Sequence, residues 1–161
     1  MNYAYGHNSF TGGGSNTACG EFSTIAGGKN NNTEPGACHT FIGGGCRNRT
    51  DTCYSTIGGG QSNCATERYT VIGGGVSNCT TACCASVLGG QSNVASHCWA
   101  SIGGGCCNAA SERFSTIGGG EGNIASGRGS FVGGGGSNQA TGLSSFVGGG
   151  TLNCANMSYT A

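Results

Sequence analysis

Cysteines are the residues whose type and spacing offer the clearest chemistry in this chain, which contains twelve of them. Six form pairs separated by fifteen residues: Cys38 with Cys53, Cys64 with Cys79, and Cys83 with Cys98. If fifteen residues make one coil of a stacked β-structure, the members of each pair lie on adjacent rungs, about 4.8 Å apart. That separation falls within the Cα–Cα range of disulfides, roughly 4.4 to 6.8 Å. The spacing therefore predicts three rung-to-rung disulfides.

The other cysteines have no partner at this spacing: Cys19, Cys46, Cys84, Cys106, Cys107 and Cys154. We expect some of them to bridge to a neighbouring subunit, with Cys19 and Cys154 as candidates, because Cys154 lies in the last coil with no rung above it. Disulfides on this scale indicate an oxidising location, either extracellular or on the surface of a virion or cell.

Other site chemistries find little support. No C-x-x-C motif occurs, and His7, His39 and His97 do not have zinc-ligand spacing, so we expect no metal site. The segment 27–30 lacks the ending of a phosphate-binding P-loop. Glu67–Arg68 and Glu112–Arg113 occupy the same place in two repeats, which is typical of solvated turns. We therefore expect neither an enzyme nor a cofactor.

A repeat of about fifteen residues organises the whole chain, as the phrase Ser-Thr-Ile-Gly-Gly-Gly at 55–60 and again at 115–120 illustrates. We number the repeat from the aliphatic residue before the glycines, which is position 1; the glycines are positions 2 to 4. Position 1 begins at Thr11, and its successive steps are fourteen, seventeen and then fifteen residues throughout. The long step has two extra residues, which we place in a bulged loop over 30–36. The predicted core residues at position 1 are Ile25, Ile42, Ile57, Ile72, Val87, Ile102, Ile117, Val132 and Val147.

A unit of this length cannot hold a pair of helices, and glycine triplets break helices. Two short strands and two turns do fit. Because alternate strand residues share a face, positions 14 and 1 point inward while 13 and 15 point outward. The sequence therefore predicts an all-β fold, a parallel β-solenoid (a two-sided β-roll) of roughly eleven coils. We expect a single domain over 1–161 without separate caps, about 50 Å long at the strand spacing.

Position 7 is asparagine in every coil. Asparagine tolerates left-handed backbone, so we expect it in a turn, and stacked amides can also bond from rung to rung. This column comprises Asn2, Asn16, Asn31, Asn48, Asn63, Asn78, Asn93, Asn108, Asn123, Asn138 and Asn153. Glycines at positions 2 to 4 should allow positive φ and close backbone approach at the other turn. Glycosylation sequons occur at Asn31, Asn48, Asn78 and Asn156, and their use requires that turn to be exposed.

Aromatic residues at positions 13 and 15 should form an outward apolar surface, which usually marks association. The predicted lateral interface consists of Phe41, Tyr54, Tyr69, Trp99, Phe114, Phe131 and Phe146, and Phe10, Phe22 and Tyr159 follow the same pattern. Position 15 mixes Thr, Phe, Val and Ser, so it lacks the flat threonine rank of an ice-binding solenoid. Trimerisation is the first hypothesis for self-association.

Six basic and six acidic residues give zero formal net charge, so we expect no nucleic-acid partner. Glycine or a polar residue interrupts every apolar run, so we expect neither membrane insertion nor a signal peptide.

The phrase Ser-Thr-Ile-Gly-Gly-Gly followed by Asn-x-Ala-Ser resembles the YadA-like head repeats of trimeric autotransporter adhesins and related phage and viral fibre repeats. The resemblance covers essentially the whole chain. It implies a left-handed parallel β-roll that trimerises side by side. The chain departs from that family in its twelve cysteines and in having no coiled-coil stalk, membrane anchor or chaperone domain.

Together these features lead us to expect a structural subunit of an extracellular or virion-surface fibre, with the chain itself as its main partner. We expect lateral association together with end-to-end stacking, because uncapped end rungs invite strand pairing. The alternative is an adhesin or fibre head that binds a host surface or a glycan. A fragment of a longer repeat protein would also have uncapped ends.

Overall fold

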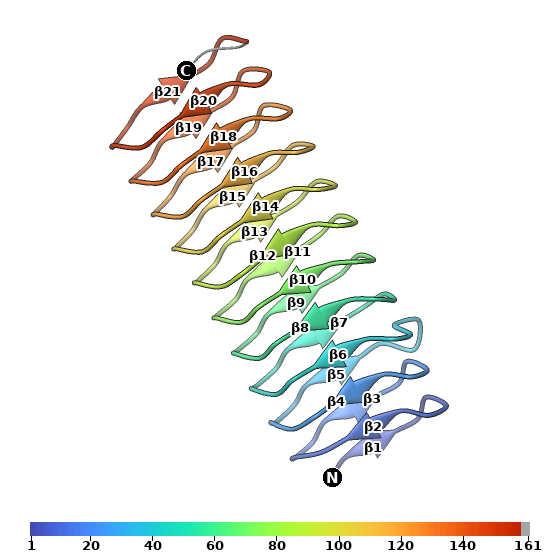
Figure 1. Ribbon diagram of the computed structural model, residues 1–161. Helices are drawn as coiled ribbons and strands as arrows, with labels where there is room; N and C mark the ends of the chain where they lie inside the picture. Colours follow the sequence, from blue (N-terminus) through green and yellow to red (C-terminus); the bar gives the residue numbers. More distant parts are fainter. Residues whose placement is uncertain (159–161) are drawn as a thin grey trace.

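Each coil contributes two strands of two residues, one to each of two parallel sheets (Figure 1). The computed structural model describes residues 1–158, which form no helix. The first sheet, here called the odd sheet, contains β1 (Tyr3–Ala4), β3 (Thr17–Ala18), β5 (Asn32–Thr33), β7 (Arg49–Thr50), β9 (Cys64–Ala65), β11 (Cys79–Thr80), β13 (Val94–Ala95), β15 (Ala109–Ala110), β17 (Ile124–Ala125), β19 (Gln139–Ala140) and β21 (Cys154–Ala155). The even sheet contains β2 (Phe10–Thr11), β4 (Thr24–Ile25), β6 (Phe41–Ile42), β8 (Thr56–Ile57), β10 (Val71–Ile72), β12 (Ser86–Val87), β14 (Ser101–Ile102), β16 (Thr116–Ile117), β18 (Phe131–Val132) and β20 (Phe146–Val147). The predicted parallel β-solenoid is confirmed.

Strand register follows the spacing of the repeat. Phe10 pairs with Thr24, Thr24 with Phe41, and Phe41 with Thr56, so the steps of fourteen, seventeen and fifteen residues each advance the chain by one coil. A third, narrower ladder of single bridges runs through position 5, from Gly14 and Lys29 to Gly136 and Thr151. The corner after the glycines is therefore hydrogen-bonded from coil to coil as well.

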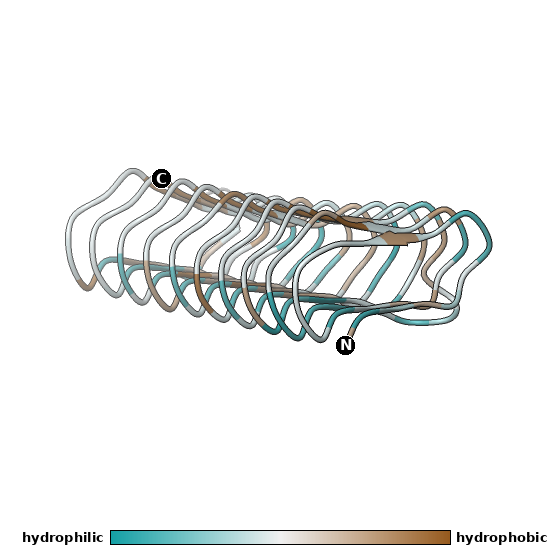
Figure 2. Ribbon diagram, turned by 90° about the horizontal axis from the view of Figure 1, so that it is seen from below, coloured by the Kyte–Doolittle hydropathy of each residue, from teal (hydrophilic) through white to brown (hydrophobic). Residues whose placement is uncertain are grey.

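The core lies between the two sheets as a thin apolar column. All nine predicted core residues are buried, and the least covered of them, Val147, is 6% exposed. Small buried residues of the odd sheet, such as Ala95 and Ala110, face them and let the sheets approach closely. Burying each Ile or Val side chain contributes roughly 1.5–3 kcal/mol. Figure 2 shows hydrophobic colour running in bands along the stacked strands.

From the second coil onward, the glycine at position 4 adopts the expected positive φ. In the first coil, which is one residue shorter, Gly13 does so instead, and Gly14 takes the place of position 5. Gly120 has φ +90°, and a Cβ there would collide with the carbonyl oxygen of Gly135 in the next coil. The preceding Gly119 has open space where its Cβ would lie and does not have a left-handed φ. In this coil, close backbone approach therefore requires glycine at position 4 rather than at position 3.

Two expectations about the turns are wrong. The column asparagines are not in left-handed backbone. From Asn16 onward the residue before each one is, as Ser92 (φ 54°) before Asn93 illustrates. Position 13 is also left-handed, as at Tyr54 (φ 62°), and so belongs to a turn rather than to an extended strand. Strand alternation does not extend to position 13 because each strand is only two residues long.

The extra residues of the long coil lie in the turn between β5 and β6. Asn32–Thr33 is an ordinary strand, whereas the turn that follows it is widened and is closed by a hydrogen bond from the Ala37 N–H to the Glu34 carbonyl (2.8 Å). Figure 1 shows this turn as the largest loop along the rod. The insertion therefore occupies only the later part of the predicted 30–36 segment and extends just beyond it.

Candidate functional site

The asparagine column forms a hydrogen-bonded ladder along one corner of the rod, and it is buried from Asn16 to Asn138. The backbone N–H of Asn93 donates to Oδ1 of Asn78 (3.0 Å), and Oδ1 of Asn93 accepts from the N–H of Asn108 (3.0 Å). Nδ2 of Asn93 donates to the carbonyls of Gly89 (3.0 Å) and Gly105 (2.9 Å). Each such asparagine therefore ties its own coil to the coils before and after it. The ladder is structural, and it leaves the amide no free group to offer a ligand.

Burial of this column overturns three of the four predicted glycosylation sites. Asn31, Asn48 and Asn78 are at most 1% exposed, and their side-chain amides are hydrogen-bonded inside the corner. A glycan on Nδ2 would replace a donor to the glycine carbonyls and has no room in the core. Asn156 is exposed and remains a prediction.

Aromatic residues form two separate rows along the rod, not the single surface that strand alternation predicted. The turn aromatic column consists of the rings at position 13: Phe22, His39, Tyr54, Tyr69, Trp99 and Phe114. The sheet aromatic row lies on the outer face of the even sheet and is interrupted. It consists of Phe10 and Phe41 near one end and the adjacent pair Phe131 and Phe146 near the other, and Thr, Val or Ser occupies this position in the strands between them. The predicted interface residues are thus divided between a turn edge and a sheet face, and Tyr159 lies outside the residues that the structure describes.

Rings of the turn aromatic column stack face to face along the rod axis. Ring centroids lie 5.3 Å apart for His39 and Tyr54 and 5.1 Å apart for Tyr54 and Tyr69, with planes within 2°. Trp99 and Phe114 also stack at 5.2 Å, and the Arg113 guanidinium lies 4.6 Å from the Trp99 ring centroid. Because neighbouring rings cover these faces, the segment from His39 to Tyr69 presents mainly ring edges to solvent. Cys84 separates this segment from Trp99 and Phe114. A sugar therefore cannot stack between the rings of the His39–Tyr69 segment.

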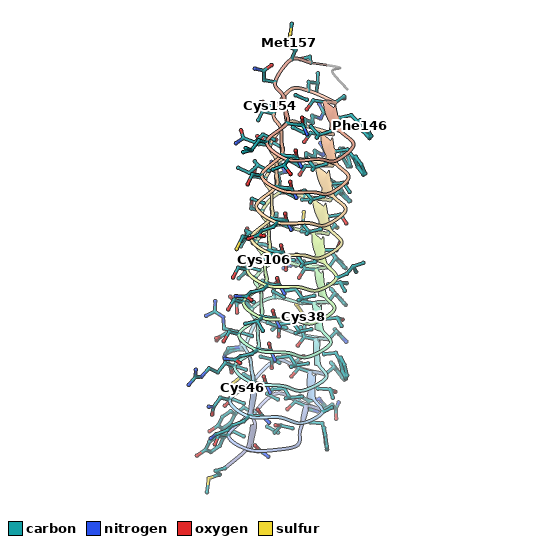
Figure 3. All side chains as sticks on the ribbon, turned by 90° about the vertical axis from the view of Figure 1, so that its left-hand side faces the viewer. Cys38, Cys46, Cys106, Phe146, Cys154 and Met157 are labelled. Carbon is teal, nitrogen blue, oxygen red and sulfur yellow. A yellow bond between two sulfur atoms is a disulfide. The ribbon has the colours of Figure 1, made fainter. Side chains whose placement is uncertain are left out.

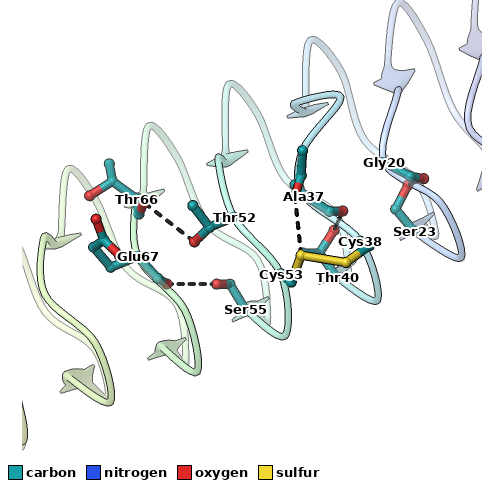
Figure 4. The surroundings of a disulfide bond; sticks show 11 residues. Gly20, Ser23, Ala37, Cys38, Thr40, Thr52, Cys53, Ser55, Thr66 and Glu67 are labelled. Carbon is teal, nitrogen blue, oxygen red and sulfur yellow. Dashed lines mark hydrogen bonds between the residues drawn. A yellow bond between two sulfur atoms is a disulfide. The ribbon is translucent and has the colours of Figure 1, made fainter.

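The three predicted cysteine pairs differ in the structure. Cys38 and Cys53 are joined by a disulfide between adjacent coils, with a Cα–Cα distance of 4.4 Å (Figure 4). Sγ of Cys83 lies 2.8 Å from Sγ of Cys98, and both are free thiols. Cys64 and Cys79 are register partners on the odd sheet and are also free. The disulfides predicted for the last two pairs remain predictions.

The unpaired cysteines lie on several sides of the rod. Cys154 is exposed on β21, on the side opposite Phe146 of β20 (Figure 3), whereas Cys19 is half-buried. Burial and the nearby Glu34 carboxylate raise the pKa of Cys19, which makes it a poor nucleophile. Bridges from these two residues to another subunit remain predictions. The sulfurs of Cys106 and Cys107 lie 3.1 Å apart, a contact that the fifteen-residue spacing does not predict but that their adjacency in the chain indicates.

Neither a metal site nor a membrane-spanning helix is present in the part of the chain that the structure describes. No three His, Cys, Asp or Glu side chains gather there in a group that could hold a metal ion. No helix among residues 1–158 has the length and apolar character needed to cross a membrane. A cavity of about 310 Å³ opens beside the last coil, where Phe146, Val147, Asn153 and Cys154 line it.

No protein-family model matches the chain, and no curated protein matches it. The likeness to YadA-like heads therefore rests on the repeat pattern and on a shared β-solenoid class with coils of about fifteen residues.

Proposed function

We propose that this chain is a structural subunit of an extracellular or virion-surface fibre that associates laterally with copies of itself. The observation that carries the proposal is the sheet aromatic row, which is exposed on a regular rod. The asparagine column, by contrast, is buried and fully hydrogen-bonded within the chain. Phe146 and Phe41 are 44% and 42% exposed on the outer face of the even sheet. Exposed apolar rows of this kind favour burial against a partner.

A second copy suits this surface because both rods repeat at the same strand spacing. Phe131 of β18 and Phe146 of β20 stack at 5.2 Å, close to the distance between rungs, so a parallel partner would meet equivalent side chains on these two successive coils. Such contacts between identical patches build closed, symmetric oligomers. A trimer is the first candidate, because the resemblance to YadA-like heads implies that arrangement.

End-to-end stacking is the second part of the proposal. Parallel sheets have strand edges at both ends of the described chain, at β1 and β2 and at β20 and β21. Edge strands readily pair with other chains. Addition of β1 and β2 of one copy to β21 and β20 of another would continue both sheets and produce a filament.

The proposed setting is oxidising, and the Cys38–Cys53 disulfide supports it. We assign no catalytic activity, cofactor, nucleic-acid partner or membrane insertion to the chain. An adhesin role on a host surface or glycan is the alternative. The covered ring faces between His39 and Tyr69 count against sugar stacking on that part of the turn aromatic column.

The test is sedimentation and negative-stain electron microscopy of the purified chain with and without reductant. We expect oligomers for the wild type and monomers for the double variant Phe131→Ser, Phe146→Ser. The matched control, Val94→Ser with Ile124→Ser, removes two exposed apolar side chains from the odd sheet and should leave association unchanged. Filaments would support end-to-end stacking, whereas a wild-type monomer at all concentrations would disprove lateral association.

A further inference from the structure

Three functional side chains lie in line on the outer face of the odd sheet. Arg49 of β7 pairs in register with Cys64 of β9, which pairs in register with Cys79 of β11. Side chains at such positions point to the same side at intervals of about 4.8 Å. Both thiols are half-buried, so each keeps access to solvent. The sheet therefore holds a guanidinium, a thiol and a second thiol in one row.

Arg49 is held in place by its own coil. Its Nη2 donates to Oδ2 of Asp51 at 2.6 Å. A guanidinium keeps its positive charge at any physiological pH, and a nearby cation favours the thiolate form of cysteine. The groups that act on Cys64 are Arg49, Cys79 and Asp51. The strands across the core, β8 and β10, carry only Thr, Ile and Val and so contribute no charge.

This environment shifts the pKa values of the two thiols in opposite directions. A hydrogen bond from Cys79, together with the Arg49 guanidinium, lowers the pKa of Cys64 to about 6 against the opposing effects of burial and Asp51. The same hydrogen bond raises the pKa of Cys79, because Cys79 is the donor to the Cys64 thiolate. Arg49 is the register neighbour of Cys64 and not of Cys79, so its charge favours the thiolate at Cys64.

The Cys83–Cys98 pair provides an internal comparison. It has the same fifteen-residue spacing and adjacent-rung placement, with sulfurs 2.8 Å apart. Its hydrogen bond with Cys98 raises the pKa of Cys83 to about 11, and no arginine is among the groups that shift it. Two pairs with the same spacing therefore have different neighbours.

We propose that Cys64 is a nucleophile for thiol–disulfide exchange with low-molecular-weight disulfides, that Arg49 is its positioning cation, and that Cys79 resolves the mixed disulfide. The Cys64 thiolate attacks one sulfur of the small disulfide; a Cys64 mixed disulfide forms and the first thiolate leaves and takes up a proton. Cys79 then loses its proton and attacks the Cys64 sulfur, which releases the second small thiol. The two cysteines are oxidised to one disulfide, and the small disulfide is reduced to two thiols.

The second step follows from the first. Once Cys64 carries a mixed disulfide it is no longer an anionic acceptor, so the principal cause of the raised Cys79 pKa disappears. Cys79 then forms its thiolate more readily, beside the sulfur that it attacks. The proposal thus explains how the predicted Cys64–Cys79 bridge would form.

The test uses the full-length chain, reduced and desalted, with limiting oxidised glutathione as the probe and peptide mapping by mass spectrometry as the readout. At pH 6 we expect Cys64 to react about tenfold faster than an ordinary cysteine, because its larger thiolate fraction outweighs its lower intrinsic nucleophilicity. Cys83 and Cys98 serve as the internal reference. Equal rates at Cys64, Cys83 and Cys98 at pH 6 would overturn the proposal.

Variants separate the three roles. Cys79→Ser should accumulate the glutathione adduct on Cys64, and Arg49→Gln should slow Cys64 several-fold and move the midpoint of its pH–rate profile upward. Lys29→Gln, which removes a cation from the position 5 ladder, is the control for charge alone and should leave that profile unchanged. Circular dichroism verifies that each variant is folded. An unchanged profile in Arg49→Gln, or no trapped adduct in Cys79→Ser, would contradict the corresponding role.

Discussion

Gly119 and Gly120 are neighbours in one corner, yet they meet different surroundings. A Cβ on Gly120 would strike the Gly135 carbonyl and lie 2.7 Å from Nδ2 of Asn123, in backbone with φ +90°. A Cβ on Gly119 would meet nothing within 4 Å. Side-chain volume is therefore forbidden at one glycine and permitted at the other.

We predict that Gly120→Ala lowers the free energy of unfolding by at least about 2 kcal/mol, because it combines a steric clash with left-handed strain. Gly119→Ala should change it by less than about 1 kcal/mol, since its φ suits alanine. Urea denaturation followed by circular dichroism measures both. Similar losses of unfolding free energy for the two variants would show that the close approach of the next coil does not decide which glycine is required.

The asparagine ladder illustrates the same selectivity at the level of one side chain. Asn93 accepts a hydrogen bond from a backbone N–H in the next coil and donates to two carbonyls, one of which is in the next coil. Aspartate has no donor for the two carbonyls, and a carboxylate buried in this corner would carry an unpaired charge. This requirement explains why the column is asparagine rather than any turn-forming residue.

Strands contribute few residues to each coil, and the turns account for most of the variation in coil length. Every strand has two residues, so strand pairing is preserved as long as the intervening turn returns the chain to the same rung. The turn between β5 and β6 does so with two extra residues, since Phe41 still pairs with Thr24 and Thr56. Turns at the position 13 edge can therefore change length.

Deleting Pro35 and Gly36 should restore a fifteen-residue coil and change the free energy of unfolding by less than about 1 kcal/mol, because loop-closure entropy varies slowly with length. Deleting Gln61 and Ser62 should be far more damaging. Gln61 bridges Cys46 and Val76 in the position 5 ladder, and its corner abuts the buried Asn63. Thermal melts compare the two deletions; equal melting temperatures would contradict the assignment of the tolerant turn.

On the scale of the whole molecule, each coil contacts mainly its neighbours, as in other solenoids. Strands β1 and β21 lie at opposite ends of the rod, and the same backbone bonds recur from rung to rung (Figure 1). Length should therefore be adjustable in units of one coil.

Removing residues 88–117 joins Val87 to Gly118 and should yield a folded rod shorter by about 10 Å, two strand spacings. Removing 88–109 instead joins an even-sheet strand to Ala110 of the odd sheet and should disrupt the core, because it omits a corner and a strand. Small-angle X-ray scattering gives the length, and circular dichroism gives the β-content. Loss of folding in the first variant would show that distant coils depend on one another.

The sequence by itself determined the period, the parallel in-register sheets and the identity of the core. A unit that repeats every fifteen residues places equivalent residues in register on adjacent coils, so the burial of Ile57 in one coil implies the burial of Ile72 in the next. It also located the Cys38–Cys53 bridge, because equal spacing along the chain becomes a single rung in space.

Only the tertiary structure decided how residues at the corners divide their roles. Identical glycines have different surroundings, and the asparagine amides turn inward and so exclude three predicted glycosylation sites. The aromatic residues separate into a turn column and a sheet row, and Cys64 differs from Cys83 because Arg49 lies beside it. These distinctions depend on distances between coils and on φ at single residues, which a one-dimensional repeat does not encode.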